Sequence, residues 1–142
     1  MSDVILIAGG SGFIGSNLAK LLVQQGNKVI CLDNLHTGNR RNIKPLLKNH
    51  NFTFIEDDVC NDKIITIFSK SKINQIYHLA SPASVPYVTQ HPVEVALTNS
   101  LGTKNLLELA HLKKARILFA SSSEVYGDPK KHPQREDYWG NV

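Results

Sequence analysis

The sequence predicts an α/β protein in which a parallel sheet of about five strands is covered by helices on both faces. Three observations support this prediction: short apolar runs recur along the chain, segments with helical spacing lie between them, and a glycine-rich turn follows the first run. Strands that alternate with helices form parallel sheets, because each helix returns the chain to the same end of the sheet. With 142 residues, 42% of them hydrophobic, the chain is long enough for one compact domain.

The expected strands are short and rich in Val, Ile and Phe, which favours strands buried on both faces. They cover residues 4–8, 28–32, 52–55, 75–78 and 116–120, and the expected helices cover 13–24, 42–48, 63–69 and 92–113. The last helix begins at Pro92, where a missing amide costs nothing, and ends at Lys113, whose cation suits the helix dipole. Gly102 in its middle costs about 1 kcal/mol relative to alanine, which indicates close packing there.

Composition and charge exclude several classes of protein. The net charge is +4, but the 16 Lys and Arg residues are interleaved with 12 acidic residues, so we expect no nucleic-acid partner. Cys31 and Cys60 are too few and too far apart for a disulfide framework, which favours a reduced, cytoplasmic setting. The apolar run 4–8 is too short for a signal or membrane segment, and the six scattered histidines do not suggest a metal site.

The glycine-rich turn, ILIAGGSGFIG, is typical of a binding site for the pyrophosphate of a dinucleotide. It places Gly10, Gly12 and Gly15 as Gly-x-Gly-x-x-Gly between the first strand and the first helix, and Gly9 adds a Gly-x-x-Gly-x-x-Gly pattern. Glycines permit the tight turn, let the pyrophosphate approach the backbone and let the helix pack closely on the strand. The helix N-terminus then offers amides to the phosphates. A glycine-rich turn alone is a weak signal, so the residues that follow decide the interpretation.

An acidic residue follows at the expected distance. The second strand ends in VICLD, and Asp33 lies 18 residues after Gly15, close to the spacing of roughly 20 that places a carboxylate on the adenosine ribose. This carboxylate would repel a 2′-phosphate, and no arginine follows it directly, so NAD is favoured over NADP. The alternative is an ordinary α/β protein in which the glycines only begin a helix.

Two further segments follow expected strands. Asp57, Asp58 and Val59 come after the third strand, where doubly wound sheets bind their ligands, although the same residues serve equally well as a cap for the next helix. HLASPAS comes after the fourth strand, and its small residues Ala80 and Ser81 would let a cofactor lie close to the backbone.

Taken in order, the glycine loop, Asp33, HLAS, TNSLGT and ASSSEVYGDP resemble the extended short-chain dehydrogenases/reductases, the NAD-dependent epimerase/dehydratase family. The stretches DNLHTGNRRNI, SEVYGDP and above all HPQREDYWGNV are similar to the UDP-glucuronate decarboxylase group of that family, and the resemblance runs from Ile5 to Val142. It implies a Rossmann-like doubly wound sheet, NAD as cofactor and a nucleotide-sugar substrate, most simply a UDP-sugar. Homodimers are common in the family.

The resemblance also implies roles for individual residues around the cofactor. It places at the pyrophosphate Gly9, Gly12, Phe13, Ile14 and Gly15. It places at the adenosine ribose Asp33, Asn34, Thr37 and Gly38. By the same resemblance, the adenine would lie beside Asp58 and Val59, and the rest of the cofactor would pass Leu79, Ala80 and Ser81.

After the fifth strand the resemblance implies part of a catalytic centre, formed by Ser122, Ser123 and Glu124. The hydroxyls would bond the C4 oxygen of the sugar, and Glu124 would lie near C5 and its carboxylate. In such enzymes NAD+ oxidises the C4 hydroxyl, the β-keto acid loses carbon dioxide, and the reduced cofactor returns the hydride. Without the resemblance, the same three residues would be interpreted as a polar loop.

The base of this family is a tyrosine followed four residues later by a lysine on the same helix face. Tyr126 and Lys130 have that spacing, but Gly127 and Pro129 between them disfavour a helical turn. No other tyrosine precedes a lysine at this distance. We therefore expect the Tyr and Lys of the base pair to be absent from these residues and to follow Val142.

These patterns predict an NAD-binding domain over residues 1–120, followed at 121–142 by an active-site loop and the start of a catalytic or substrate region. The match departs from the group in HPVEVALTN, where decarboxylases usually carry lysines and this chain has Glu94 and Leu97. Two alternatives therefore stay open. One is a 4,6-dehydratase or 4-epimerase of dTDP- or UDP-hexoses, and the other is a nucleotide-binding fragment without turnover.

Overall fold

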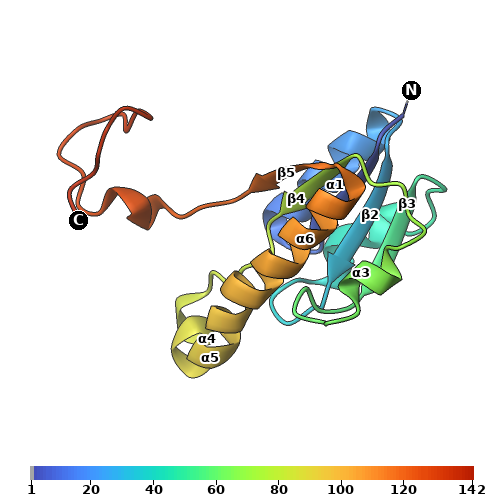
Figure 1. The fold of residues 1–142 in the computed structure, drawn as a ribbon, viewed down its shortest axis with the longest axis horizontal. Helices are drawn as coiled ribbons and strands as arrows, with labels where there is room; N and C mark the ends of the chain where they lie inside the picture. Colours follow the sequence, from blue (N-terminus) through green and yellow to red (C-terminus); the bar gives the residue numbers. More distant parts are fainter. Residues whose placement is uncertain (1) are drawn as a thin grey trace.

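The computed structural model describes residues 2–142, which form a Rossmann-like α/β fold around one parallel sheet (Figure 1). The strand order is β3-β2-β1-β4-β5. The strands are β1 (Val4–Ala8), β2 (Lys28–Asp33), β3 (Phe52–Glu56), β4 (Gln75–His78) and β5 (Arg116–Phe119). Since β1 is central and the chain moves outward first through β2 and β3 and then through β4 and β5, the connections diverge between β1 and β4. Ligands of such sheets bind at this divergence, beyond the carboxyl ends of the strands.

Alternate residues of the central strand enter two separate cores. Leu6 and Ala8 pack with Leu106 and Leu109 on one face of the sheet. Ile5 and Ile7 belong to a second core on the other face. Burial on both faces explains why β1 is an unbroken apolar run, VILIA, instead of an alternating one.

The helices divide between these two faces. On one face α1 (Phe13–Gln24) and α2 (Arg40–Ile43) contribute Ala19, Leu22, Val23 and Ile43 to their core. On the other face lie α3 (Ile64–Ile67) and α6 (Thr103–Lys113), and α6 runs along the sheet in front of it in Figure 1. The pair α4 (Val85–Gln90) and α5 (Pro92–Leu97) extends beyond the sheet at the end of α6.

The helix expected over 92–113 is continuous but not uniform. A π-helical turn, Thr98–Gly102, joins α5 to α6. A Cβ atom at Gly102 would lie 2.6 Å from Cγ2 of Val59, so the close packing expected at this glycine is confirmed. The helix ends at Lys113, and the C-cap residue Lys114 has a positive φ of 51°, with His111 and Lys113 in the last turn.

Most expected elements are present, with changes at their ends. The expected strands 4–8 and 75–78 and the helix 13–24 match the structure, whereas the strand expected at 116–120 ends one residue earlier. The helix expected at 42–48 is instead α2 followed by a 3-10 turn, Lys44–Leu46, because Pro45 interrupts regular helical bonding. The prediction missed α4, since its sequence VPYVTQ contains a proline and two valines and follows the turn-like SPAS.

The last residues leave the sheet and extend away from it (Figure 1). A short 3-10 turn covers Ser123–Tyr126, and a loop then closes on itself where Asp128 N donates to the carbonyl oxygen of Asn141 at 3.0 Å. The rings of Tyr126 and Tyr138 stack with centroids 6.1 Å apart. Within residues 2–142, no helix combines the length and the apolar character needed to cross a bilayer.

The packing at Gly102 generates a stability prediction. Gly102→Ala gains about 1 kcal/mol of helix propensity, but its new methyl group meets Val59, and such overpacking costs about 1–3 kcal/mol. We expect a net loss of about 1 kcal/mol in the free energy of unfolding, measured by urea denaturation. In a Val59→Ala background the same substitution should be neutral or stabilising. An equal loss in both backgrounds would exclude the contact as its cause.

Candidate functional site

The glycine loop lies against the start of the loop that follows β4. Gly9 has a φ of +79°, and a Cβ there would lie 2.6 Å from the carbonyl carbon of Leu79. A Cβ at Gly15 would collide with the carbonyl oxygen of Gly9, so the first turn of α1 can pack on the loop only with glycine at this position. A Cβ at Gly12, in contrast, would meet only one atom, at 3.3 Å. Two glycines therefore close the loop on the protein, and Gly12 leaves its outer side open.

The open side coincides with the N-terminus of α1. Gly12 is the N-cap residue and provides no side-chain cap, and the first turn contains no acidic residue. Phe13 and Ile14 expose 83% and 67% of their surface. Free amides and the positive end of the helix dipole therefore face a surface that a phosphate can reach, because no side chain of the turn competes for them.

Asp33 joins the glycine loop to the loop that follows β2. Its Oδ2 accepts a hydrogen bond from Ser11 N at 2.9 Å, and its Oδ1 accepts one from Leu35 N at 2.8 Å. The residue is 9% exposed. Each carboxylate oxygen has a second lone pair, so the group can still accept hydrogen bonds from hydroxyl groups.

Gly38 allows the loop after β2 to fold back onto this carboxylate. A Cβ at Gly38 would lie 2.7 Å from Asp33 Oδ1 and would collide with the Ser11 hydroxyl. Asn39 N donates to the Ser11 carbonyl oxygen at 3.2 Å, which holds the same loop from the other side. The Ser11 hydroxyl is buried and has no hydrogen-bond partner within residues 2–142. Thr37, between these contacts, is exposed.

The two aspartates after β3 have different roles. Asp57 accepts hydrogen bonds from the Asn61 side chain at 2.9 and 3.1 Å and from the Asp58 amide at 2.8 Å, so it stabilises its own turn. Asp58 instead accepts a hydrogen bond from Asn34 Nδ2 at 2.7 Å and one from Cys60 N at 2.7 Å. Of the two carboxylates, Asp58 is therefore the one joined to the loop after β2.

Partial burial raises the pKa of Asp58, but the hydrogen bonds from Cys60 and Asn34 and the nearby His36 outweigh it and hold that pKa below its ordinary value. The carboxylate is therefore ionised at neutral pH. Val59 beside it is buried, so of these two residues it is the Asp58 side chain that faces the loop after β2.

The cysteines do not provide a nucleophile. Burial, together with the negative charge of Asp33, raises the pKa of the Cys31 thiol to about 12. Burial and the charge of Asp58 also raise the pKa of Cys60. Thiols held in the protonated form are poor nucleophiles at neutral pH.

The structure brings most of the predicted cofactor residues together at one edge of the sheet. The glycine loop, Asp33, Asn34, Gly38 and Asp58 follow β1, β2 and β3, and Leu79 and Ala80 follow β4 and touch Gly9. Ser81 is exposed, and its backbone amide donates to the Leu79 carbonyl oxygen at 3.1 Å. This arrangement fits a dinucleotide, because an open glycine backbone and a helix N-terminus lie beside a carboxylate that has free lone pairs.

The predicted catalytic residues lie apart from these loops. Ser122, Ser123 and Glu124 are exposed and bond one another, with Glu124 N donating to Ser122 Oγ at 3.2 Å and Ser123 Oγ donating to Glu124 Oε1 at 3.3 Å. No hydrogen bond within the described residues joins them to the cofactor loops. No helical turn joins Tyr126 to Lys130, because the 3-10 turn ends at Tyr126 and Gly127 has a φ of 62°.

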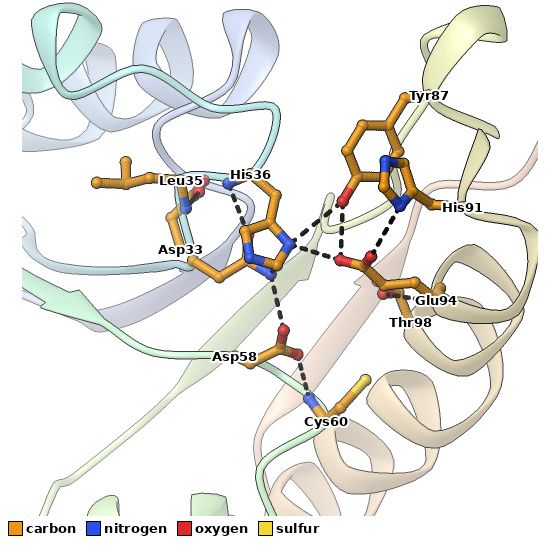
Figure 2. A network of polar contacts seen from close by, with 10 residues as sticks. Asp33, Leu35, His36, Asp58, Cys60, Tyr87, His91, Glu94 and Thr98 are labelled. Atoms are coloured by element: carbon orange, nitrogen blue, oxygen red, sulfur yellow. Dashed lines mark hydrogen bonds and ion pairs between the residues drawn. The ribbon is translucent and has the colours of Figure 1, made fainter.

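Sequence reasoning missed a polar cluster beside the site, which Figure 2 shows. Glu94 of α5 contacts His36 Nδ1 at 2.6 Å and accepts a hydrogen bond from Tyr87 of α4 at 2.8 Å. His91 Nδ1 lies 3.7 Å from the other carboxylate oxygen. The one available signal was the carboxylate of Glu94 in a segment where the resembling proteins carry lysines.

His78 at the end of β4 was also not predicted as a polar site residue. It is 3% exposed, and its Nε2 lies 2.9 Å from Thr103 Oγ1. Because that hydroxyl donates its proton to the Asn99 carbonyl oxygen at 2.7 Å, it accepts from His78, and Nε2 therefore carries the proton. The buried Nδ1 has no partner within residues 2–142, and burial lowers the pKa of the ring.

The His78 environment predicts a pH-dependent stability. The pKa in the folded protein lies below the ordinary value of 6.5, so protonation favours the unfolded chain. The contribution of neutral His78 to the free energy of unfolding is fully present above pH 6.5 and is lost as the pH falls toward the folded pKa. Between these two values the free energy of unfolding falls by at most about 1.4 kcal/mol per pH unit. His78→Gln should remove this part of the pH dependence in urea titrations at several pH values. An unchanged slope would contradict the assignment.

Comparison with solved structures finds the same fold in nucleotide-sugar enzymes. The chain is 31% identical to an epimerase from Methanothermobacter thermautotrophicus, with a TM-score of 0.85 over 96% of this chain and 40% of that one. It is 30% identical to a UDP-glucose 4-epimerase from Brucella ovis in complex with NAD, with a TM-score of 0.82 over 99% of this chain and 42% of that one.

Curated relatives are more similar in sequence. The chain is 48% identical over 138 residues to UDP-glucuronic acid decarboxylase 1 of Danio rerio, and the match covers 97% of this chain and 32% of the relative. It is 48% identical over 139 residues to UDP-glucuronic acid decarboxylase 5 of Arabidopsis thaliana, of which it covers 39%. The chain thus spans between about a third and two fifths of the length of these relatives. The GDP-mannose 4,6 dehydratase family model matches residues 6–139, almost the whole chain, and the chain therefore belongs to this family of NAD-dependent epimerases and dehydratases.

Proposed function

We propose that this chain binds NAD across the carboxyl ends of β1, β2, β3 and β4. The observation that carries the proposal is the Asp33 carboxylate, held by two backbone amides at the end of β2 with lone pairs left for the ribose hydroxyls. In this proposal Asp33, Asn34, Thr37 and Gly38 bind the adenosine ribose. The pyrophosphate lies on Gly9, Gly12, Phe13, Ile14 and Gly15, the adenine lies beside Asp58 and Val59, and the rest of the cofactor passes Leu79, Ala80 and Ser81.

The cofactor would supply hydride transfer at C4 of a sugar, and the chain would supply orientation and hydrogen bonds. Ser122 and Ser123 would donate to the C4 oxygen, and Glu124 would lie near C5. These side chains are exposed in the loop after β5, which begins at the same edge of the sheet as the cofactor loops. Tyr126 and Lys130 are not the base of this centre, because they do not share a helical turn.

For the complete protein we propose decarboxylation of UDP-glucuronate to UDP-xylose. The support is the identity of 48% to relatives described as UDP-glucuronic acid decarboxylases. We also propose a cytoplasmic location, which the free thiols of Cys31 and Cys60 favour, and a homodimer.

A second candidate is epimerisation at C4 or 4,6-dehydration of a nucleotide hexose. It is favoured by Glu94, a carboxylate in a segment where the resembling decarboxylases carry lysines, and by structural neighbours that include UDP-glucose 4-epimerases. A lysine attracts a substrate carboxylate, whereas Glu94 repels one. A Glu94 carboxylate beside the sugar would therefore suit an uncharged hexose better than a glucuronate.

Calorimetric titration with NAD tests the cofactor site. Loss of hydrogen bonds to a charged group costs about 1.5–3 kcal/mol, so Asp33→Ala should weaken NAD binding roughly 10- to 100-fold. Asp33→Asn, which preserves the shape of the side chain, should also weaken NAD binding. Asp62→Ala is the matched control, because Asp62 is an exposed aspartate that follows β3. Unchanged affinity in both Asp33 variants would overturn the ribose assignment.

The preference for NAD over NADP gives an independent test of the same carboxylate. We expect the wild-type chain to bind NADP more weakly than NAD, because Asp33 repels the 2′-phosphate. Asp33→Ala should reduce this difference while it lowers the affinity for NAD. Equal affinities for the two cofactors in the wild-type chain would contradict the proposal.

Product analysis separates the two candidate reactions. With the complete protein, UDP-glucuronate should release carbon dioxide and yield UDP-xylose, and UDP-glucose should be recovered unchanged. A UDP-hexose inverted at C4, or one dehydrated between C4 and C6, would instead support the second candidate. Absence of turnover with every nucleotide sugar would favour a nucleotide-binding role alone.

A further inference from the structure

The loop that carries the proposed ribose-binding residues has a strained backbone. Leu35, between Asn34 and His36, has a φ of 61°, a conformation that costs energy for a large side chain. Its amide donates to Asp33 Oδ1 at 2.8 Å, so the strained backbone is what directs this amide at the carboxylate. A segment of this kind persists only where surrounding contacts hold it.

The outer contact comes from α5, 58 residues further along the chain. Glu94 Oε1 lies 2.6 Å from His36 Nδ1, and the same oxygen accepts a hydrogen bond from Tyr87 OH at 2.8 Å. Since a carboxylate is acceptor-only, Nδ1 of His36 must carry a proton and donate it to Glu94. Asn34 Nδ2 lies 3.4 Å from the same nitrogen, but as a second donor it cannot bond it and directs its proton to Asp58 at 2.7 Å.

Glu94 is held in place from its own side. Tyr87 lies in α4, and its ring lies beside that of His91, with centroids 4.5 Å apart and ring planes tilted by 32°. The hydrogen bond from Tyr87 and the nearby His36 and His91 hold the pKa of Glu94 below its ordinary value, so the carboxylate is ionised at neutral pH. Figure 2 shows the resulting chain of contacts, from Tyr87 and Glu94 to His36 in the loop after β2. Asn34 of the same loop continues it to Asp58.

We propose that Glu94 is a positioning residue that fixes the 34–38 loop, through His36, for the adenosine ribose of the cofactor. The inference rests on the NAD site proposed above and extends it to α5, which contributes none of the predicted binding residues. Glu94 acts at a distance from the cofactor: it bonds His36, and His36 in turn donates its backbone amide to Asn34 Oδ1 at 3.1 Å. Loss of Glu94 would release the outer side of the loop and let the Leu35 backbone leave its positive φ. The hydrogen bond from Leu35 N to Asp33 Oδ1 would then be lost in part of the population.

Glu94→Gln tests the inference in the intact chain. The variant keeps the size of the side chain and removes the charge, and we expect it to weaken binding of NAD roughly tenfold in calorimetric titration, the effect of a lost charged hydrogen bond. Binding of ADP-ribose, which shares the adenosine ribose, should weaken by the same factor. The control is Glu108→Gln in the neighbouring helix α6, which removes the exposed ion pair between Lys104 Nζ and Glu108 Oε1, 2.9 Å apart. It should leave the affinities for NAD and for ADP-ribose unchanged.

A second variant separates positioning from a general structural effect. If Glu94 acts through His36, then Glu94→Gln should add no further loss of NAD affinity to a His36→Ala chain. Independent losses that multiply in the double variant would overturn the inference, and so would NAD binding by Glu94→Gln within twofold of wild type. The melting temperature of the free chain should fall by no more than a few degrees, because the Glu94 side chain is 38% exposed and belongs to neither core.

The same experiments distinguish the two proposals. If Asp33→Ala weakens NAD binding as expected and Glu94→Gln does not alter it, the cofactor site stands and the positioning role is wrong. If the wild-type chain binds neither NAD nor ADP-ribose, both proposals are wrong.

Discussion

The pair of hydrogen bonds on the Asp33 carboxylate is the interaction on which the arrangement of the site depends. Ser11 N comes from the glycine loop and Leu35 N from the loop after β2, so one buried side chain binds both segments, and the bond from Asn39 N to the Ser11 carbonyl oxygen joins them a second time. Charge-assisted hydrogen bonds of this kind are stronger than those between neutral groups. Gly38 then packs on the same carboxylate, and this contact requires a residue without a side chain. In the proposed NAD site, one carboxylate therefore both holds the loops and binds the ribose.

The sheet beneath the site supplies the rigidity that these contacts need. Because Leu6 and Ala8 enter one core while Ile5 and Ile7 enter the other, β1 is fixed from both faces. The loops after β1 and β4 therefore emerge from a fixed position, close enough that Gly9 touches the backbone of Leu79. A rigid sheet with short, tightly packed loops suits a cofactor that has to be held in one orientation.

The polar cluster around Glu94 links this site to the helices beyond the sheet. It contains Glu94, which lies in the segment where the resemblance to the decarboxylases led us to expect lysines. The carboxylate is occupied by His36 and Tyr87, so its negative charge is partly neutralised within the chain. In the proposals above, Glu94 therefore bears both on the choice of sugar and on the position of the 34–38 loop.

The strands, the helix α1, the glycine loop and the position of Asp33 could be predicted from the sequence, since all of these depend on the periodicity and spacing of neighbouring residues. Only the tertiary structure decided that Asp58 and not Asp57 joins the loop after β2, that VPYVTQ forms a helix, and that Glu94 reaches His36 across 58 positions. The physical reason is the range of the interactions. Local patterns record propensity and burial, whereas the partner of a polar side chain depends on which distant segments the folded sheet brings within hydrogen-bonding distance.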